Sequence, residues 1–374
     1  MHLTTLAAEN FRNLETFRLD PDRRFNLIEG RNGQGKTNFL EAVYLLSAFK
    51  SARDAKNGEL VRFGCERATI YGEVVRREIA RTIEIGLSAS GKKVVLDGKP
   101  ITALPSSGAH LNAVVFGPDD LELTKGGPAP RRRFLDRATY AIWPDYVADL
   151  RSYRLALESR NKLLRLAREG RGRDEAVFES YEATIAQHAV RLLERRKMFL
   201  AALRPIFERM FAAITAGELT AAIDYVRAGE RVSDGGVVPD LATFAERLAR
   251  ARGGDERMGY TRFGPHADDL VFHVGSGDGE HAARTFASQG QHRALVLALK
   301  IAELESTKNA IGVYPVFLLD DVSSELDEAR NRHLMATLEA AGGQVFITTT
   351  DRRWLQLQNP GAIWRVESGR ISRL

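Results

Sequence analysis

The feature that most constrains this chain is one stretch of eight residues, Gly30-Arg31-Asn32-Gly33-Gln34-Gly35-Lys36-Thr37. It fits G-x-x-x-x-G-K-[ST], the pattern of a phosphate-binding P-loop. The apolar segment at 25–29 predicts a short buried strand before it, and the spacing of apolar residues predicts a helix over 37–49. Glycines let successive backbone N–H groups converge on an anion, and the helix start adds a positive dipole end. All eight residues are therefore predicted to bind a nucleoside triphosphate, with Lys36 at the β- and γ-phosphates and Thr37 at Mg²⁺.

A second motif is an apolar run at 316–319 that ends in two carboxylates, Asp320 and Asp321. A continuously apolar run is typical of a buried parallel strand, although a surface strand ending in an acidic turn would give the same letters. Given the P-loop, we predict that Asp320 holds Mg²⁺ and that Asp321 orients or deprotonates an attacking water. These two are the candidate catalytic residues. Ser324 is predicted to cap a further helix.

The third motif is Ser288-Gln289-Gly290-Gln291, directly before a helix predicted over 293–305. Its position predicts an anion site at a helix start, with Ser288, Gly290 and Gln291 as nucleotide-binding residues. A chain that already holds one P-loop has most use for this second surface if it is presented to another protomer. We therefore predict that nucleotide is sandwiched between two copies of the chain.

The order of predicted elements divides the chain into a split head and an inserted arm. Residues 1–130 are rich in strand signals and contain an Asp97-Gly98 hairpin turn. Residues 131–254 are mainly helical, and strand signals return over 255–374. The predicted helices outside the P-loop motif cover 146–169, 175–198, 241–252, 293–305 and 328–341, the first two forming an antiparallel pair. The later predicted strands cover 221–226, 269–274, 284–286, 314–319, 344–348, 363–366 and 370–374.

Charge is concentrated in the arm. Residues 131–210 contain 18 Lys and Arg against 11 Asp and Glu, an excess of seven, whereas the net charge of all 374 residues is +5. A basic block on one module is expected of a polyanion binder, although a solvated Arg-rich helical surface gives the same count.

The single cysteine, Cys65, excludes an intrachain disulfide framework. Without an apolar run of about 20 residues or a signal-like start, we expect a cytoplasmic protein with no membrane partner.

The three motifs, with Ser324-Glu325-Leu326-Asp327 after the second, resemble in their order the ABC-type ATPase heads of the SMC class. Within that class the chain is similar to the RecF family of bacterial recombination mediators. Further stretches carry this resemblance: Asn10–Asn13, Pro118–Leu121, Arg131–Asp136, Gly264–His266, Leu319–Asp327 and Ile347–Thr350. Ala267 departs from it, because an arginine is expected there. The shorter Asp321 stands where transporter ATPases carry glutamate, and Thr349 and Thr350 lie near the place of their histidine switch.

The resemblance implies an α/β fold, an ABC/SMC-type ATPase head with a P-loop core, an antiparallel β subdomain and an inserted helical arm. It implies a slow, DNA-stimulated ATPase that uses ATP and Mg²⁺ and forms a homodimer on ATP. It also implies binding to DNA at single-strand/double-strand gap junctions, and assistance to RecO and RecR in loading RecA. The arm residues Arg131, Arg132, Arg133, Arg195, Arg196 and Lys197 would then contact phosphates, with little dependence on base sequence.

Other ATPases share some of these motifs. Another SMC-like DNA clamp ATPase is the main alternative, but a chromosome-organising SMC protein needs a far longer coiled coil. A transport ATPase subunit would need a surface for a membrane partner, and a small-molecule kinase has no use for the Ser-Gln-Gly-Gln motif. Sedimentation with ATP and DNA distinguishes these classes.

Overall fold

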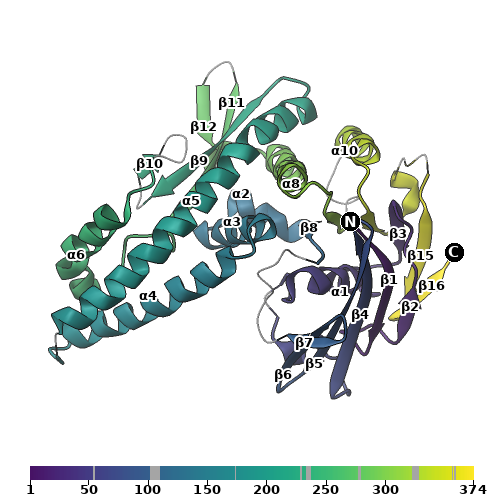
Figure 1. The fold of residues 1–374 in the computed structure, drawn as a ribbon. Helices are drawn as coiled ribbons and strands as arrows, with labels where there is room; N and C mark the ends of the chain where they lie inside the picture. Colours follow the sequence, from purple (N-terminus) through teal and green to yellow (C-terminus); the bar gives the residue numbers. More distant parts are fainter. Residues whose placement is uncertain are drawn as a thin grey trace. The chain divides into compact units, whose positions relative to one another are not determined.

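The computed structural model describes residues 1–53, 55–101, 110–172, 174–227, 230–232, 237–276, 279–321, 328–355, 357 and 359–374. The chain forms two compact units (Figure 1): unit 1 comprises Met1–Leu121 and Val296–Leu374, and unit 2 comprises Glu122–Leu295. A split head with an inserted module was predicted, but residues 255–295 were assigned to the head and lie in unit 2. The reason is strand pairing, because β11 (Asp269–Ser276) pairs antiparallel with β9 (Thr220–Arg227).

The P-loop strand lies inside a six-stranded, mainly parallel sheet of unit 1. Its order is β16-β15-β3-β14-β13-β8, and only β16 is antiparallel to its neighbour. The strands are β3 Phe25–Glu29, β8 Ala113–Phe116, β13 Val316–Leu319, β14 Val345–Thr349, β15 Ala362–Glu367 and β16 Arg370–Arg373. All residues of β13 and β14 are buried, as expected of strands covered on both faces. Strands from both ends of the sequence therefore build one sheet.

The second sheet of unit 1 is antiparallel, with the order β2-β1-β4-β5-β6-β7. Its strands are β1 His2–Glu9, β2 Phe17–Leu19, β4 Arg67–Arg76, β5 Ile79–Ser88, β6 Gly91–Leu96 and β7 Lys99–Ile101. Asp97 and Gly98 form the predicted two-residue turn, since Leu96 pairs with Lys99 and both turn residues have positive φ. Leu14, just before β2, forms only an isolated bridge to Phe11.

Helix α1 (Lys36–Ala48) contacts strands of both sheets of unit 1. Its apolar residues face all sides, and ten of its thirteen residues are buried, which fits a helix enclosed in a core. The other helical segments that contribute to unit 1 are η1 Asn57–Leu60, η2 Pro118–Leu121, α8 Gln289–Ile311, α10 Glu328–Ala341 and η4 Arg352–Trp354. The boundary between the units falls within α8. The predicted cap Ser324 lies outside the described residues, while α10 has the predicted bounds.

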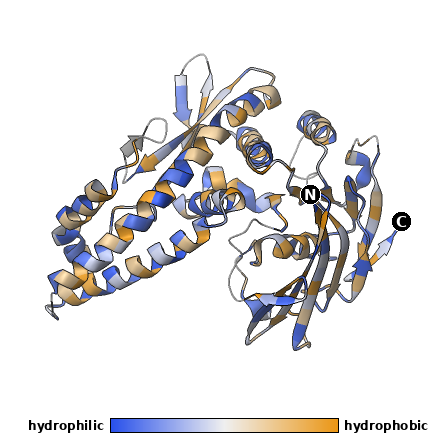
Figure 2. Ribbon diagram, in the orientation of Figure 1, coloured by the Kyte–Doolittle hydropathy of each residue, from blue (hydrophilic) through white to orange (hydrophobic). Residues whose placement is uncertain are grey.

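Unit 2 combines helices with a four-stranded sheet of order β10-β9-β11-β12. Helices α4 and α5 pack together and carry polar and apolar residues in alternation along each helix (Figure 2). The helices are α2 Glu122–Lys125, α3 Pro128–Ile142, α4 Tyr146–Arg168, α5 Glu175–Ile214, α6 Leu241–Met258 and α7 Ala283–Phe286, and the remaining strands are β10 Glu230–Val232 and β12 Gly279–Ala282. The prediction of a strand at 284–286 is wrong, because these residues form α7.

Among the described residues, no helix combines the length and the apolar character that crossing a bilayer requires.

Candidate functional site

The P-loop connects the end of β3 to the start of α1, as its spacing predicted. Gly33 and Gly35 have φ of 79° and 120°, in the region that favours glycine. A Cβ at Gly35 would also lie 2.7 Å from Asn13 Oδ1 and 2.7 Å from Leu14 Cδ2. The loop therefore needs glycine at position 35 for both conformation and space.

The side chain of Lys36 folds back over the P-loop. Its Nζ donates to Gly30 O at 2.7 Å, to Arg31 O at 3.1 Å and to Asn32 Oδ1 at 3.3 Å. Burial lowers the pKa of Lys36, and the carboxylates of Asp321 and Asp320 act in the opposite direction. These loop oxygens hold the ammonium group at the pocket, where the oxygens of a phosphate could replace them.

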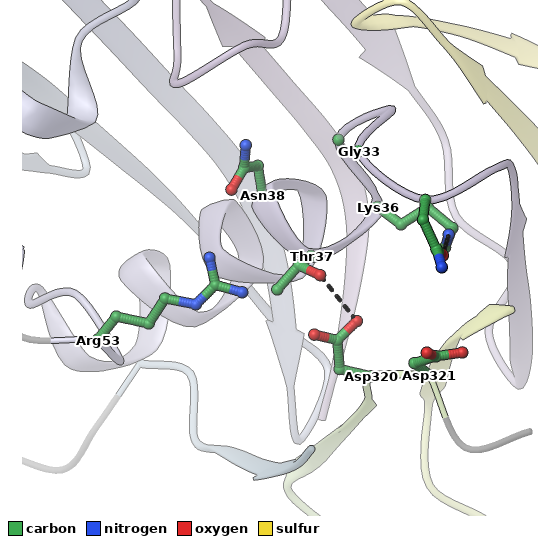
Figure 3. A pocket seen from close by; sticks show the side chains of 9 residues that line it. Gly33, Lys36, Thr37, Asn38, Arg53, Asp320 and Asp321 are labelled. Carbon is green, nitrogen blue, oxygen red and sulfur yellow. Dashed lines mark hydrogen bonds between the residues drawn. The ribbon is translucent and has the colours of Figure 1, made fainter. Parts of the chain in front are cut away.

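The end of β13 meets the start of α1 at a shared carboxylate (Figure 3). Thr37 Oγ1 donates to Asp320 Oδ1 at 3.1 Å, and Thr348 Oγ1 donates to the same oxygen at 2.7 Å. Mg²⁺ prefers such oxygen ligands and usually takes one or two carboxylates, with phosphate and water oxygens completing its shell. Thr37 and Asp320 therefore fit the Mg²⁺ role that the sequence predicted.

Asp321 follows directly in a left-handed conformation, with φ of 50°, which is uncommon for a residue with a side chain. Its backbone N–H donates to Thr348 Oγ1 at 2.9 Å. Asp320 and Asp321 are thus both tied to Thr348, and both line the same pocket as Lys36. Residues that lie almost 300 positions apart in the sequence come together here.

The pocket has a volume of about 330 Å³. Its lining residues are Asn32, Gly33, Gly35, Lys36, Thr37, Asn38, Arg53, Asp320 and Asp321. Sequence reasoning did not assign Asn38 or Arg53 to the site. Asn38 could have been found because it directly follows the motif, whereas Arg53 lies beyond α1, in a segment with no local signal. Its guanidinium group points toward Thr37 (Figure 3).

Both ends of the chain brace the P-loop. Asn13 Nδ2 donates to Gly33 O at 3.3 Å, and Asn13 Oδ1 accepts from Asn38 Nδ2 at 2.8 Å. From the turn between β15 and β16, Ser368 N donates to Gln34 Oε1 at 2.5 Å and Gly369 N donates to Gln34 O at 3.2 Å. We refer to these contacts as the P-loop brace. Gln34, predicted to bind nucleotide, is thus held by the C-terminal turn through its side chain and its carbonyl.

The third motif lies in unit 2, at the start of α8. Ser288 N donates to Gln291 Oε1 at 2.7 Å, and Gln291 N donates to Ser288 Oγ at 3.2 Å. This reciprocal pair is a capping box, which fixes the first turn of the helix. The helix begins at Gln289, four residues earlier than predicted. Gly290 lies in this first turn, so all three predicted residues are found at one helix N-terminus.

Two of the predicted DNA contacts are buried instead. Arg131, 5% exposed, forms a two-bond ion pair with Asp269 at 2.8 and 2.7 Å and also donates to two backbone carbonyls. Arg196, 2% exposed, donates to Asp136 at 2.8 Å and to three further oxygens of unit 2. Protein oxygens already surround both guanidinium groups, so a contact with DNA would require each to give up these bonds, and the two stay predictions as DNA contacts.

The other four predicted DNA residues reach the surface to different degrees. Arg133 and Lys197 are exposed, whereas Arg132 and Arg195 are partly buried. Arg132 Nη1 donates to Asp268 O at 2.9 Å, and the guanidinium of Arg195 lies over the ring of Trp143. These four remain predictions as DNA contacts.

Comparison with known proteins agrees with this geometry. The family model of the RecF/RecN/SMC N-terminal domain matches residues 2–368. The DNA replication and repair protein RecF of Anaeromyxobacter sp. (strain Fw109-5) is 41% identical over 381 residues, covering 100% of both chains. A solved structure of the recombination mediator protein RecF-ATPrS in the RecFOR pathway has a TM-score of 0.87 at 31% identity, covering 100% of this chain and 98% of the other.

A more distant likeness concerns the fold alone. The Smc head domain of Pyrococcus furiosus, bound to the C-terminal domain of ScpA, has a TM-score of 0.56 at 17% identity and covers 100% of this chain. The predicted ABC/SMC-type head is thereby confirmed, and the chain belongs to the RecF/RecN/SMC family, within it to the RecF DNA replication and repair proteins.

Proposed function

We propose that the chain is an ATP-dependent DNA-binding protein of recombinational repair and replication. The observation that carries this proposal is the pocket in which Lys36, Thr37 and Asp320 converge from distant parts of the sequence. Lys36 would neutralise the β- and γ-phosphates, and Thr37 and Asp320 would hold Mg²⁺, which supplies positive charge at the phosphate oxygens. Two solved RecF structures, one described as RecF-ATP and the other as RecF-ATPrS, support ATP as the nucleotide.

In this proposal ATP hydrolysis is slow and acts as a switch. Asp321 lines the pocket beside Asp320 and is short for a base that must reach water near the γ-phosphate. It would accept the proton of that water. We expect Asp321→Asn to slow hydrolysis by on the order of 100-fold and to prolong the ATP-bound dimer. Phosphate release and dimer lifetime measure this, and a loss of ATP binding in the variant would contradict the assigned role.

The ATP-bound form would be a homodimer. Each nucleotide would lie between one P-loop and the partner's Ser288 loop, whose capping box supplies a fixed helix N-terminus. Two protomers would then bind single- and double-stranded DNA at gap junctions. The RecFOR pathway of the solved relative supports RecR, acting with RecO, as a partner. RecA would be an indirect partner.

Gel-shift binding to gapped duplex with ATP, ADP or no nucleotide tests the proposal. We expect ATP to strengthen binding, and Lys36→Arg to remove that dependence, because a guanidinium does not fit the place of the compact ammonium group. Nucleotide binding by Lys36→Arg should fall at least about tenfold, while its circular dichroism matches that of the parent. A strict monomer in sedimentation, with saturating non-hydrolysable nucleotide and duplex present, would contradict the dimer.

A further inference from the structure

Unit 2 contains a hollow of about 190 Å³ that neither the motifs nor the nucleotide pocket explain. Its charged and titratable lining residues are Arg132, Arg133, Arg154, Arg196, Asp136, Tyr153 and His266. We call it the arginine hollow. It is built by α3, α4, α5 and the Gly264–His266 loop, a stretch that the sequence singled out without a role.

The charges of the arginine hollow do not cancel. Asp136 Oδ1 accepts from the buried Arg196 at 2.8 Å and from Tyr146 Oη at 2.6 Å, so Arg196 already balances this carboxylate. Arg154 reaches the other oxygen of Asp136 at 3.3 Å, with 60% of its side chain still exposed. The lining contains four guanidinium groups and one carboxylate, so its side chains carry a net positive charge.

The floor of the hollow is held in one neutral arrangement. His266 Nε2 lies 2.9 Å from the backbone oxygen of Thr261, which can only accept, so Nε2 carries the proton. His266 Nδ1 then accepts from Tyr153 Oη at 2.5 Å. Burial lowers the pKa of His266 and raises that of Tyr153, which agrees with a neutral pair. Arg196 also donates to Pro265 O at 2.9 Å and fixes the loop. The arginines thus surround a preformed floor.

We propose that the arginine hollow holds one backbone phosphate of a nucleic acid. This proposal rests on the DNA binding proposed above and names its place. Guanidinium groups match the several acceptor oxygens of a phosphate, and a concave site favours a group that projects from a strand. The volume equals that of about six water molecules, which leaves room for a phosphate and some of its water.

The lining also argues for the backbone rather than the bases. Tyr153, the one Phe, Tyr or Trp side chain among the lining residues, is buried and offers no face for stacking a base. The contact would therefore be indifferent to sequence. It would involve Arg132, Arg133 and Arg154, the last of which the sequence did not indicate.

The test compares Arg133→Gln, Arg154→Gln and their double variant with a control, Arg151→Gln. Arg151 is exposed on the same helix as Arg154, and its loss removes the same charge outside the hollow. The affinity for gapped duplex, with ATP present, is measured against salt concentration. Each phosphate contact contributes about 0.9 to the steepness with which log affinity falls with log salt concentration. The slope of the double variant should therefore be shallower than the parent's by about 1.

The outcomes separate this proposal from the broader one. If the parent chain does not bind duplex at all, the proposed function fails. If it binds and the double variant keeps the parent's slope, or loses no more than Arg151→Gln, the phosphate site is overturned. Arg154→Lys keeps the positive charge and should keep the parent's salt slope. It controls for a loss of binding that comes from altered folding rather than from lost charge. Stabilisation of the parent by inorganic phosphate over chloride at equal ionic strength, with unchanged DNA binding in the double variant, would assign the hollow to a free anion and overturn the proposal.

Discussion

The nucleotide pocket of unit 1 and the arginines of unit 2 were predicted from different kinds of signal. The pocket was predicted from eight consecutive residues, whose spacing fixes backbone geometry, and five of them line it together with Asp320 and Asp321. The arginines came from a charge excess summed over 80 residues. Two neighbouring arginines of unit 2 have different surroundings. Arg195 stacks on Trp143 near the surface, whereas Arg196 is buried among oxygen atoms. A contiguous motif predicts geometry, whereas a charge count does not say which side chains face solvent.

The largest effect is expected when the buried Arg196 and the more exposed Arg195 are each replaced and the stabilities are compared. Arg196→Met should lower the free energy of unfolding by about 3–5 kcal/mol, because it leaves the partly buried Asp136 without its main cation. Arg195→Gln should change stability by less than about 0.5 kcal/mol, since its ion pair with Asp145 is long and exposed. Denaturant unfolding measures both. Equal stability of the two variants would remove the distinction between buried and exposed arginines.

Local pattern predicted most elements of the fold, and packing decided where they end. Helix α5 continues past Pro205 to Ile214, although proline penalises a helix interior. Phe207 and Phe211 lie beyond that proline and are fully buried, so the burial of the helix face outweighs the local penalty. In the same way α6 continues through Gly253 and Gly254. A sequence pattern does not show the partner surfaces that supply this burial.

Sequence patterns predicted the residues of the candidate site that belong to contiguous motifs, but not the residues that support them. The P-loop residues, Asp320 and Asp321 follow from spacing. The brace residues Asn13 and Gly369 lie in turns at opposite ends of the chain, and nothing local links either to the P-loop. Pairing of β15 with β3 brings the C-terminal turn to that place, which is a consequence of sheet order rather than of sequence pattern.

The next effect tests whether the pocket depends on this distant support. Gly369 has φ of 80°, and a Cβ there would lie 2.1 Å from the backbone oxygen of Asn13. Gly369→Ala should lower the free energy of unfolding by about 2–4 kcal/mol and weaken ATP binding, because the turn that holds Gln34 must move. Gly98→Ala is the matched control, since its φ is 75° but nothing lies within 4 Å. It should cost only about 1–2 kcal/mol and leave ATP affinity unchanged. Equal ATP affinity in both variants would show that the brace does not support the pocket.

The smallest expected effect concerns the charge of the buried Asp268 in unit 2, which depends on pH. Burial raises the pKa of Asp268 to about 6, although the hydrogen bond from Tyr225 and the charge of Arg196 act to lower it. In the unfolded chain the pKa of an aspartate is about 4, so the folded state binds the proton more tightly. The resulting stabilisation is present at low pH and is lost as pH rises through about 6.

Asp268→Asn mimics the protonated acid and keeps an acceptor for Tyr225 Oη, which lies 2.6 Å from Oδ2 of Asp268. Its free energy of unfolding relative to the parent should therefore rise by about 1 kcal/mol between about pH 5 and about pH 7.5. The exposed Asp145→Asn should show no such trend. A difference between Asp268→Asn and the parent that is constant across this range would mean that Asp268 keeps its charge throughout. Asp268 would then be a permanent charge of unit 2.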